Sequence, residues 1–153
     1  EVVARELDLD VDQLDLRFPC QRVSTGLEFL LVPLRSYAAL KQAVAPHSGA
    51  LAPAFFLFCP GGYEKSQAIQ ARMFAVELGV TEDPATGSAN GCLAAYLAEH
   101  LFFDDPEVRV TVGQGYEINR PSQLYISADK NVSDYRIEVG GKVRLIAEGE
   151  WLL

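Results

Sequence analysis

The sequence predicts an α+β domain in which a curved sheet wraps around one buried helix. The segment from Thr86 to His100 has the length of a helix, and its apolar residues step around the whole circumference instead of forming one stripe. About seven apolar or alternating segments elsewhere in the chain are typical of strands. Because a helix without a polar face needs cover on every side, a curved sheet around it accommodates the pattern.

Length and composition indicate a single domain over residues 1–153, since a chain of this size can bury roughly two-thirds of its unfolded surface. The 49% of hydrophobic and 22% of charged residues are ordinary globular values that leave no room for a long disordered tail. The net charge of −8 and the scattered Lys and Arg residues argue against binding to nucleic acid or to anionic membranes. No apolar run is long enough to cross a membrane, and no secretory leader is recognisable.

The three cysteines, Cys20, Cys59 and Cys92, are odd in number, lie in mostly apolar settings and form no CxxC pair. This usage favours a reducing, cytoplasmic location over a disulfide scaffold. His47 has no partner motif, and His100 ends the central helix, where a cation suits the helix dipole. Without clustered ligands we expect no metal.

The first half of the chain predicts two short helices and two buried strands. Residues 1–7 can form a helix, and the four aspartates within residues 8–15 indicate a solvated connection after it. The apolar runs 28–32 and 54–59 predict buried strands. Between them, Ser36 is placed to cap a helix that runs to about Val44.

The second half predicts strands on both sides of the central helix. Residues 68–74 alternate as an extended segment, in which we interpret Arg72 as a structural ion-pair partner. Further strands are expected at residues 108–112, 124–127, 135–139 and 142–146. Gly140-Gly141 between the last two is a signal for a tight hairpin.

Polar residues gather where the central helix begins. Asp83, followed by Pro84, can start the helix, and Thr86 is an equally good cap, so the first turn can begin at either residue. Gly87 and Ser88 follow, and a helix N-terminus with free amides is a ready site for an anion. Ordinary capping and glycine packing account for the same residues, and in proteins this is the commoner situation.

Beyond these patterns, Arg72-Met73-Phe74, Gly79-Val80 and the block from Glu82 to Ala89 resemble the signature of the phenazine-biosynthesis PhzF-like family of isomerases and epimerases. Further matches are Ser24-Thr25-Gly26 and Gln114-Gly115 followed by Arg120-Pro121-Ser122. The resemblance implies the diaminopimelate-epimerase-like fold, with two similar lobes that each wrap a curved, mostly antiparallel sheet around a central helix. It also implies an active site in the cleft between the two helix N-termini.

The resemblance covers only the C-terminal lobe of such a protein. The family's first-lobe elements, including a catalytic glutamate and a Cys-Gly-His-type turn, have no match in this sequence. We therefore expect either a fragment, which the absence of an initial methionine favours, or a partner chain that supplies the missing first lobe.

Carried over residue by residue, the resemblance implies that Asp83 is the catalytic acid of this lobe, facing the reacting carbon or orienting a substrate amine. Thr86, Gly87 and Ser88 are implied substrate-binding residues for a small-molecule carboxylate. Arg120 is a candidate second anion contact, although a plain surface arginine explains it equally well. Cys92 lies one turn deeper in the helix and is expected in the core, which disfavours a two-thiol racemase.

Two functions from different classes stay open. The first is a half-site for an isomerase or epimerase that transfers a proton on a small carboxylate metabolite without a cofactor, and this chain alone is then expected to be inactive. The second is a catalytically silent lobe that serves as a binding or interaction module. A homodimer is a further option, and the substrate stays open because family members share these motifs across different small molecules.

Overall fold

The computed structural model of the chain describes residues 1–130 and 134–151. Within these residues eight strands form one sheet. The strands are β1 (Gln21–Ser24), β2 (Glu28–Pro33), β3 (Phe55–Pro60), β4 (Ile69–Ala75), β5 (Val80–Asp83), β6 (Val108–Gln114), β7 (Ser122–Lys130) and β8 (Tyr135–Gly141). The helices are α1 (Val2–Glu6), α2 (Tyr37–Gln42) and α3 (Gly87–Glu99), and two short 3-10 turns are η1 (Val11–Gln13) and η2 (Val76–Leu78).

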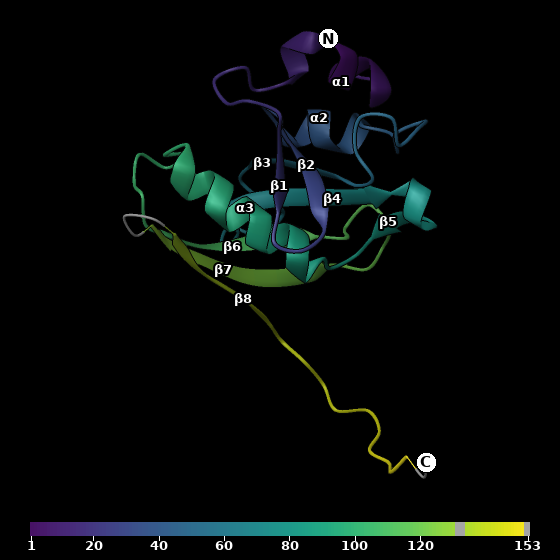
Figure 1. The fold of residues 1–153 in the computed structure, drawn as a ribbon, viewed down its shortest axis with the longest axis vertical. Coiled ribbons are helices and arrows are strands. Elements are labelled where there is room, and N and C mark those ends of the chain that lie inside the picture. Colours follow the sequence, from purple (N-terminus) through teal and green to yellow (C-terminus); the bar gives the residue numbers. More distant parts are fainter. Residues whose placement is uncertain (131–133, 152–153) are drawn as a thin grey trace.

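The sheet has the order β1-β2-β3-β4-β6-β7-β8, and β5 pairs with β4 beside this path. The pairs β2–β3 and β4–β6 are parallel, whereas the other pairs among the described strands are antiparallel. The sheet curls so strongly that α3 lies between the strands β1 to β4 and the strands β6 to β8 (Figure 1). This arrangement confirms the predicted α+β fold with a curved, mostly antiparallel sheet around a central helix.

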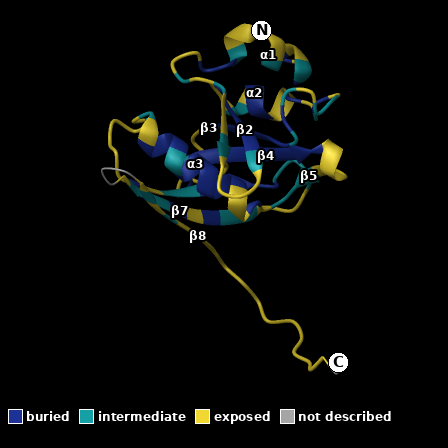
Figure 2. Cartoon of the chain, in the orientation of Figure 1, coloured by how far each residue is buried: buried dark blue, intermediate teal, exposed yellow. Residues whose placement is uncertain are grey.

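Helix α3 is enclosed as its sequence predicts. Every residue from Ala89 to Ala98 except Ala95 is buried, and the helix is dark along most of its length in Figure 2. Leu93 and Leu97 are fully buried, and the hydroxyl of Tyr96 donates to the carbonyl of Pro19 at 2.7 Å. The small residues of the helix explain how strands can close around it from several sides.

The strands β2, β3 and β4 are buried on both faces, which explains why they read as continuous apolar runs. Phe56 and Phe58 of β3 pack into the cluster around α3, whereas Phe55 and Cys59 pack into a second cluster with α1 and α2. Burial raises the pKa of the Cys59 thiol to about 12, so this side chain is a protonated apolar group. All three cysteines are free thiols.

The prediction of a hairpin at Gly140-Gly141, followed by a last strand, is wrong. Gly140 and Gly141 continue β8, opposite Tyr125 and Leu124 of β7. Residues 142–150 form no strand and run away from the body of the molecule (Figure 1). A Gly-Gly pair permits a tight turn, but here the ladder with β7 keeps both glycines extended. The connection between β7 and β8 includes residues 131–133, which lie outside the described residues.

Three further features differ from the sequence-based expectation. The four-residue strands β1 and β5 are short and partly exposed, so they carry no apolar pattern that would reveal them. Asp15, expected in a solvated connection, is 2% exposed and accepts two hydrogen bonds from the guanidinium of Arg17, at 2.9 and 2.7 Å. These hydrogen bonds lower the pKa of the Asp15 carboxyl.

A buried ion pair fastens β5 to the rest of the fold. The guanidinium of Arg72 on β4 donates to both carboxylate oxygens of Glu82 on β5, at 3.0 and 2.8 Å. It also donates to the carbonyl oxygens of Leu40 and Ala43 at the end of α2, at 3.0 and 2.7 Å. The interpretation of Arg72 as a structural ion-pair partner is therefore confirmed. Since Glu82 precedes Asp83, this pair also anchors the strand that carries the candidate acid.

Replacing Arg72 by Met is expected to lower the free energy of unfolding by ~3–5 kcal/mol, because the Glu82 carboxylate is left buried without its partner. Urea denaturation measures the effect. Arg109→Met is the matched control: it removes a pair with Asp129 at 2.8 Å in which the arginine side chain is 61% exposed, and it should cost about 1 kcal/mol or less. Equal losses for the two variants would show that the Arg72 pair is not a structural anchor.

Candidate functional site

Four of the five site residues that the sequence singles out meet where α3 begins. Asp83 is the last residue of β5 and lies opposite Met73 of β4. After Pro84 and Ala85 the chain turns, and Thr86 occupies the N-cap position of α3. The structure thus decides between the two possible starts of the helix: Asp83 ends a strand, and the first helical turn begins at Gly87.

Thr86 acts on Asp83 instead of on the helix amides. Its hydroxyl donates to Oδ2 of Asp83 at 2.6 Å, and its side chain makes no capping hydrogen bond. Thr86 is buried, whereas Asp83 is half-buried. A short bond to a carboxylate is among the stronger neutral-to-charged hydrogen bonds, so it holds the Asp83 side chain in one orientation beside the helix.

The carboxamide of Gln114, at the end of β6, joins the pieces of this site. Its Nε2 donates to the carbonyl of Asp83 at 2.8 Å and to Oγ1 of Thr86 at 3.0 Å. Its Oε1 accepts from Nδ2 of Asn90 at 3.0 Å and from the Thr86 amide at 3.3 Å. Both Gln114 and Asn90 are fully buried. One side chain therefore fixes the end of β5 and the first turn of α3 relative to the sheet.

Gly115 lets the chain after β6 come close to the turn that precedes α3. Its φ is +81°, and a Cβ at this position would lie 2.4 Å from the carbonyl oxygen of Arg120 and 2.8 Å from that of Pro84. A side chain would therefore both strain the backbone and clash with main-chain atoms that cannot move aside. Glycine is required for this close approach.

The N-terminus of α3 presents donors to solvent. Gly87 and Ser88 are exposed, and the first amides of a helix have no acceptor within it. From the turn between β1 and β2, Thr25 donates to the carbonyl of Ser88 at 3.2 Å, which steadies the first turn. Amides at this end, together with the helix dipole, favour an anion.

A hollow of about 540 Å³ adjoins this helix end. Its lining comes from the turn before α3, the start of β7 and the end of β8, namely Ala85, Gly87, Pro121, Ser122, Gln123, Leu124, Val139, Gly140, Gly141 and Lys142. Lys142 and Gly87 therefore line the same hollow. The space is wide enough for a small metabolite.

The predicted site residues do not all meet. Asp83, Thr86, Gly87 and Ser88 lie together at the start of α3. Arg120 is exposed in the turn before β7, where its amide donates to the carbonyl of Gly115 at 2.9 Å. Its neighbours Pro121 and Ser122 line the hollow, but among the described residues Arg120 is not part of that lining.

Cys92 lies in the core, as its position in the helix predicts. It is fully buried, and its sulfur is 3.6 Å from the hydroxyl of Thr25. Burial is the main reason that the pKa of the Cys92 thiol is raised. A protonated thiol without access to the hollow is a poor base.

The described residues contain no group of three or more His, Cys, Asp or Glu side chains placed to hold a metal ion. Within the same part of the chain, no helix has the length and apolar character that a membrane span requires.

Sequence reasoning missed Gln114, Asn90 and Thr25 as supports of the site. Gln114 and Thr25 stood only inside short matching motifs, with no role attached to them. Asn90 was the residue from which such a support could have been predicted. It is an amide side chain inside an otherwise apolar helix, and a buried polar group needs a hydrogen-bond partner.

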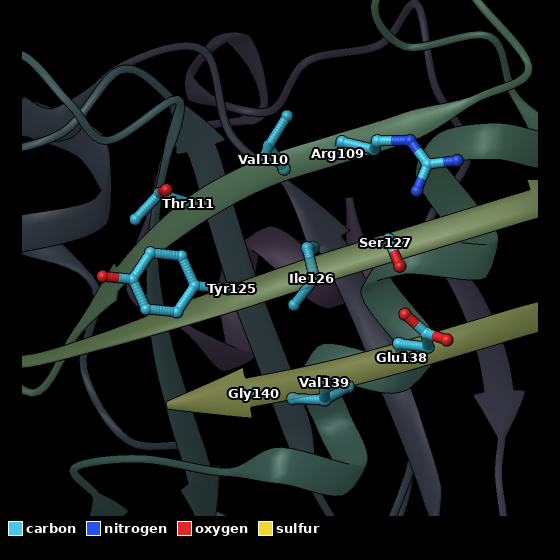
Figure 3. Close-up of a pocket in the computed structure, with 9 residues that line it drawn as sticks. All are labelled: Arg109, Val110, Thr111, Tyr125, Ile126, Ser127, Glu138, Val139 and Gly140. Atoms are coloured by element: carbon cyan, nitrogen blue, oxygen red, sulfur yellow. The ribbon is translucent and has the colours of Figure 1, made fainter. Parts of the chain in front are cut away.

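A second hollow, of about 530 Å³, lies on the face of β6, β7 and β8 that points away from α3 (Figure 3). The register places Arg109, Ser127 and Glu138 in one row and Thr111, Tyr125 and Gly140 in the next. Tyr125 and Gly140, which lie opposite each other in the register, both line this hollow. It contains none of the residues at the start of α3.

Comparison with known proteins shows a match to one protein family. Residues 3–149 match the family described as phenazine biosynthesis-like protein. The trans-2,3-dihydro-3-hydroxyanthranilate isomerase of Pseudomonas aeruginosa is 37% identical over 137 residues, which are 86% of this chain and 47% of that protein. An uncharacterized isomerase of Clostridium acetobutylicum is 26% identical over 165 residues, covering all of this chain and 54% of that protein.

Among solved structures, the crystal structure of a Bacillus anthracis phenazine biosynthesis protein of the PhzF family is similar with a TM-score of 0.79 and 27% sequence identity. The match covers 92% of this chain and 51% of that chain. The chain thus spans about half the length of the relatives that it matches.

Replacing Gln114 by Met is expected to lower the free energy of unfolding by ~1–3 kcal/mol, because the buried Asn90 amide and the Thr86 hydroxyl lose a partner. Amide chemical shifts from Asp83 to Asn90 should move in the same variant. Gln42→Met serves as the control, since Gln42 is an exposed residue on α2 bonded to Gln13. If Gln114→Met were as stable as the control with unchanged shifts, Gln114 would not hold this site together.

Proposed function

The chain belongs to the family of phenazine biosynthesis-like proteins, and from this premise we propose that it forms one lobe of an isomerase and supplies half of the active site. The proposed reaction is a cofactor-independent proton transfer on a small carboxylate-bearing metabolite. Relatives named as isomerases support the reaction class. The anthranilate skeleton in the name of the Pseudomonas aeruginosa relative supports a carboxylate substrate.

The observation that carries the proposal is the pairing of a fixed carboxylate with free helix amides. The hydroxyl of Thr86 holds the Asp83 carboxylate at 2.6 Å, and Asp83 lies four residues before the exposed Gly87. In the proposed site the amides of Gly87 and Ser88 bind the substrate carboxylate, and Asp83 faces the reacting carbon or orients a substrate amine. Thr86 then acts through Asp83 as a positioning residue.

The rest of the site has to come from elsewhere. Proton transfer needs a second acid or base on the opposite side of the substrate and a site closed to bulk water. The hollow beside Gly87 is open in this chain, and the relatives are about twice as long. We therefore assign residues 1–153 to a single lobe and the principal acid/base to the other half of the protein.

Arg120 and Lys142 are the cations placed to assist at the mouth of this site. Lys142 is among the residues that line the hollow, whereas Arg120 directly precedes two lining residues, Pro121 and Ser122. A guanidinium or ammonium group near the helix amides would strengthen the binding of a substrate carboxylate there.

Titration with benzoate is expected to shift the amide signals of Gly87 and Ser88 in an NMR spectrum, while those of the exposed turn at Gly61 and Gly62 stay in place. Ser88→Pro removes one amide donor at a position in the first turn where proline is tolerated, and should weaken binding. Ser88→Ala removes only the hydroxyl and should leave most of the binding. Equal binding by both variants would mean that the amides are not the anion site.

In the two-lobed protein, Asp83→Asn is expected to lower kcat/KM by ~10²–10⁴, the usual contribution of a positioned acid or base. Ser88→Ala should cost less, because the backbone amides and the dipole stay in place. Asp12→Asn, at an exposed aspartate of η1, is the control. The substrate named for the Pseudomonas aeruginosa relative is the first to assay.

Two results would refute this assignment: near wild-type kcat/KM for Asp83→Asn, or turnover by residues 1–153 without another lobe. Binding of carboxylates by a two-lobed protein that never isomerises them would favour a catalytically silent binding module instead.

A further inference from the structure

Residues 115–121, the connecting loop between β6 and β7, lead directly into one wall of the hollow beside α3. Pro121 and the following Ser122 line that hollow together with Gly87, and Arg120 directly precedes them. The position of the connecting loop therefore decides where these side chains lie relative to the helix amides.

The connecting loop is closed by its own backbone. The Arg120 amide donates to the carbonyl of Gly115 at 2.9 Å, and the Asn119 amide donates to the carbonyl of Tyr116 at 3.2 Å. Asn119 has a φ of +57°, a conformation that asparagine tolerates better than most residues. These bonds set the shape of the loop, whereas its position depends on contacts with other segments.

The side chain of Glu117 attaches the connecting loop to two such segments. Its Oε1 accepts hydrogen bonds from the hydroxyl of Tyr63 at 2.7 Å and from that of Tyr37 at 3.0 Å. Tyr37 begins α2, and Tyr63 lies between β3 and β4. The second oxygen, Oε2, is buried, so the carboxylate lies inside this group of side chains. Hydrogen bonds to a carboxylate are stronger than those between neutral groups.

Aromatic rings support the same attachment. The ring of Tyr63 stacks on that of Tyr116, with centroids 4.1 Å apart, and meets the ring of Tyr37 edge-on at 4.6 Å. The buried Gln67 donates from Nε2 to the Tyr116 hydroxyl at 2.7 Å. Burial, followed by the hydrogen bond to Glu117, raises the pKa of Tyr37 to about 12, so this phenol stays a donor at neutral pH.

We propose that Glu117 is a positioning residue of the active site, which acts through the connecting loop to place Arg120, Pro121 and Ser122 at the hollow. The inference rests on the proposed function and adds a residue that is not part of the hollow's lining. A loop that is already held in place needs no ordering when the substrate binds. Glu117 therefore lowers KM and leaves the proton transfer at Asp83 unchanged.

Steady-state kinetics of the full-length gene product, with the substrate named for the Pseudomonas aeruginosa relative, test this role. Glu117→Met removes both carboxylate oxygens and should raise KM about tenfold, with kcat within about twofold of the wild type. Glu117→Gln keeps an oxygen that can accept from both hydroxyls, so its KM should stay within about twofold of the wild type.

Two tyrosine variants form a matched pair. Tyr63→Phe removes one hydroxyl donor to Glu117 and should raise KM by a smaller factor than Glu117→Met. Tyr125→Phe is the control, because Tyr63 and Tyr125 are both 44% exposed, and within the described residues Tyr125 is not bonded to Glu117. Its KM should equal that of the wild type.

Hydrogen exchange followed by mass spectrometry observes the connecting loop directly. Peptides covering residues 115–123 should exchange at least ~10-fold faster in Glu117→Met than in the wild type or in Tyr125→Phe. Peptides of β3 and β4 should stay protected in every variant, which reports that the variants are folded.

Unchanged exchange of the connecting loop in Glu117→Met would overturn the proposal. So would unchanged KM in an active isomerase, a fall in kcat at constant KM, or equal effects of Glu117→Gln and Glu117→Met. If the wild type has no isomerase activity, the proposed function fails, and the Kd for benzoate replaces KM. A higher Kd for Glu117→Met then supports the positioning role, whereas an unchanged Kd, or no binding by the wild type, overturns it.

Discussion

The candidate site depends on the side chain of one glutamine. Gln114 ends β6, yet its carboxamide reaches the backbone of Asp83 on β5, the hydroxyl and amide of Thr86, and the side chain of Asn90 on α3. Each of these groups is polar and most are buried, so each would be costly without a partner. Satisfying all of them at once brings a strand end and a helix start to fixed positions, and the geometry of Asp83 follows from that.

Strand β5 is held from two sides by consecutive residues. The Glu82 carboxylate accepts hydrogen bonds from Arg72 on the side of α2, whereas the Asp83 carboxylate accepts one from Thr86, the residue before α3. Side chains of a strand alternate between faces, so four residues are enough to tie the two layers together. The exposed donors of Gly87 and Ser88 thus stand on a rigid base, as a binding site requires.

Patterns with a strong local cause were predictable from the sequence. The all-round apolar segment from Ala89 to Ala98 predicted an enclosed helix, and the apolar runs predicted strands buried on both faces, since such patterns have few other solutions. Short strands such as β5 were missed because tertiary pairing, not composition, makes them. The pair Gly140-Gly141 misled for the same reason: whether it turns or stays extended depends on the neighbouring strand β7.

For the site, the capping pattern put Asp83, Gly87 and Ser88 near the start of the central helix, where they lie, but it left two residues able to start the helix. Asp83 and Thr86 are both good caps by composition. Which of them caps was decided by contacts with Gln114, a residue 28 positions further along the chain from Thr86. Hydrogen bonds of this range depend on strand register, which the sequence does not reveal by itself.

The position of α3 inside the sheet also bears on how the chain reaches its native state. Strands that cover the helix precede it in the chain (β1 to β4) and follow it (β6 to β8), and two of the strand pairs are parallel. During synthesis the apolar helix therefore emerges before half of its cover exists. Its final burial waits for the last strands, and contacts of such long sequence separation form slowly. Until then the nascent chain exposes a helix with no polar face, and such transiently exposed apolar surface favours aggregation.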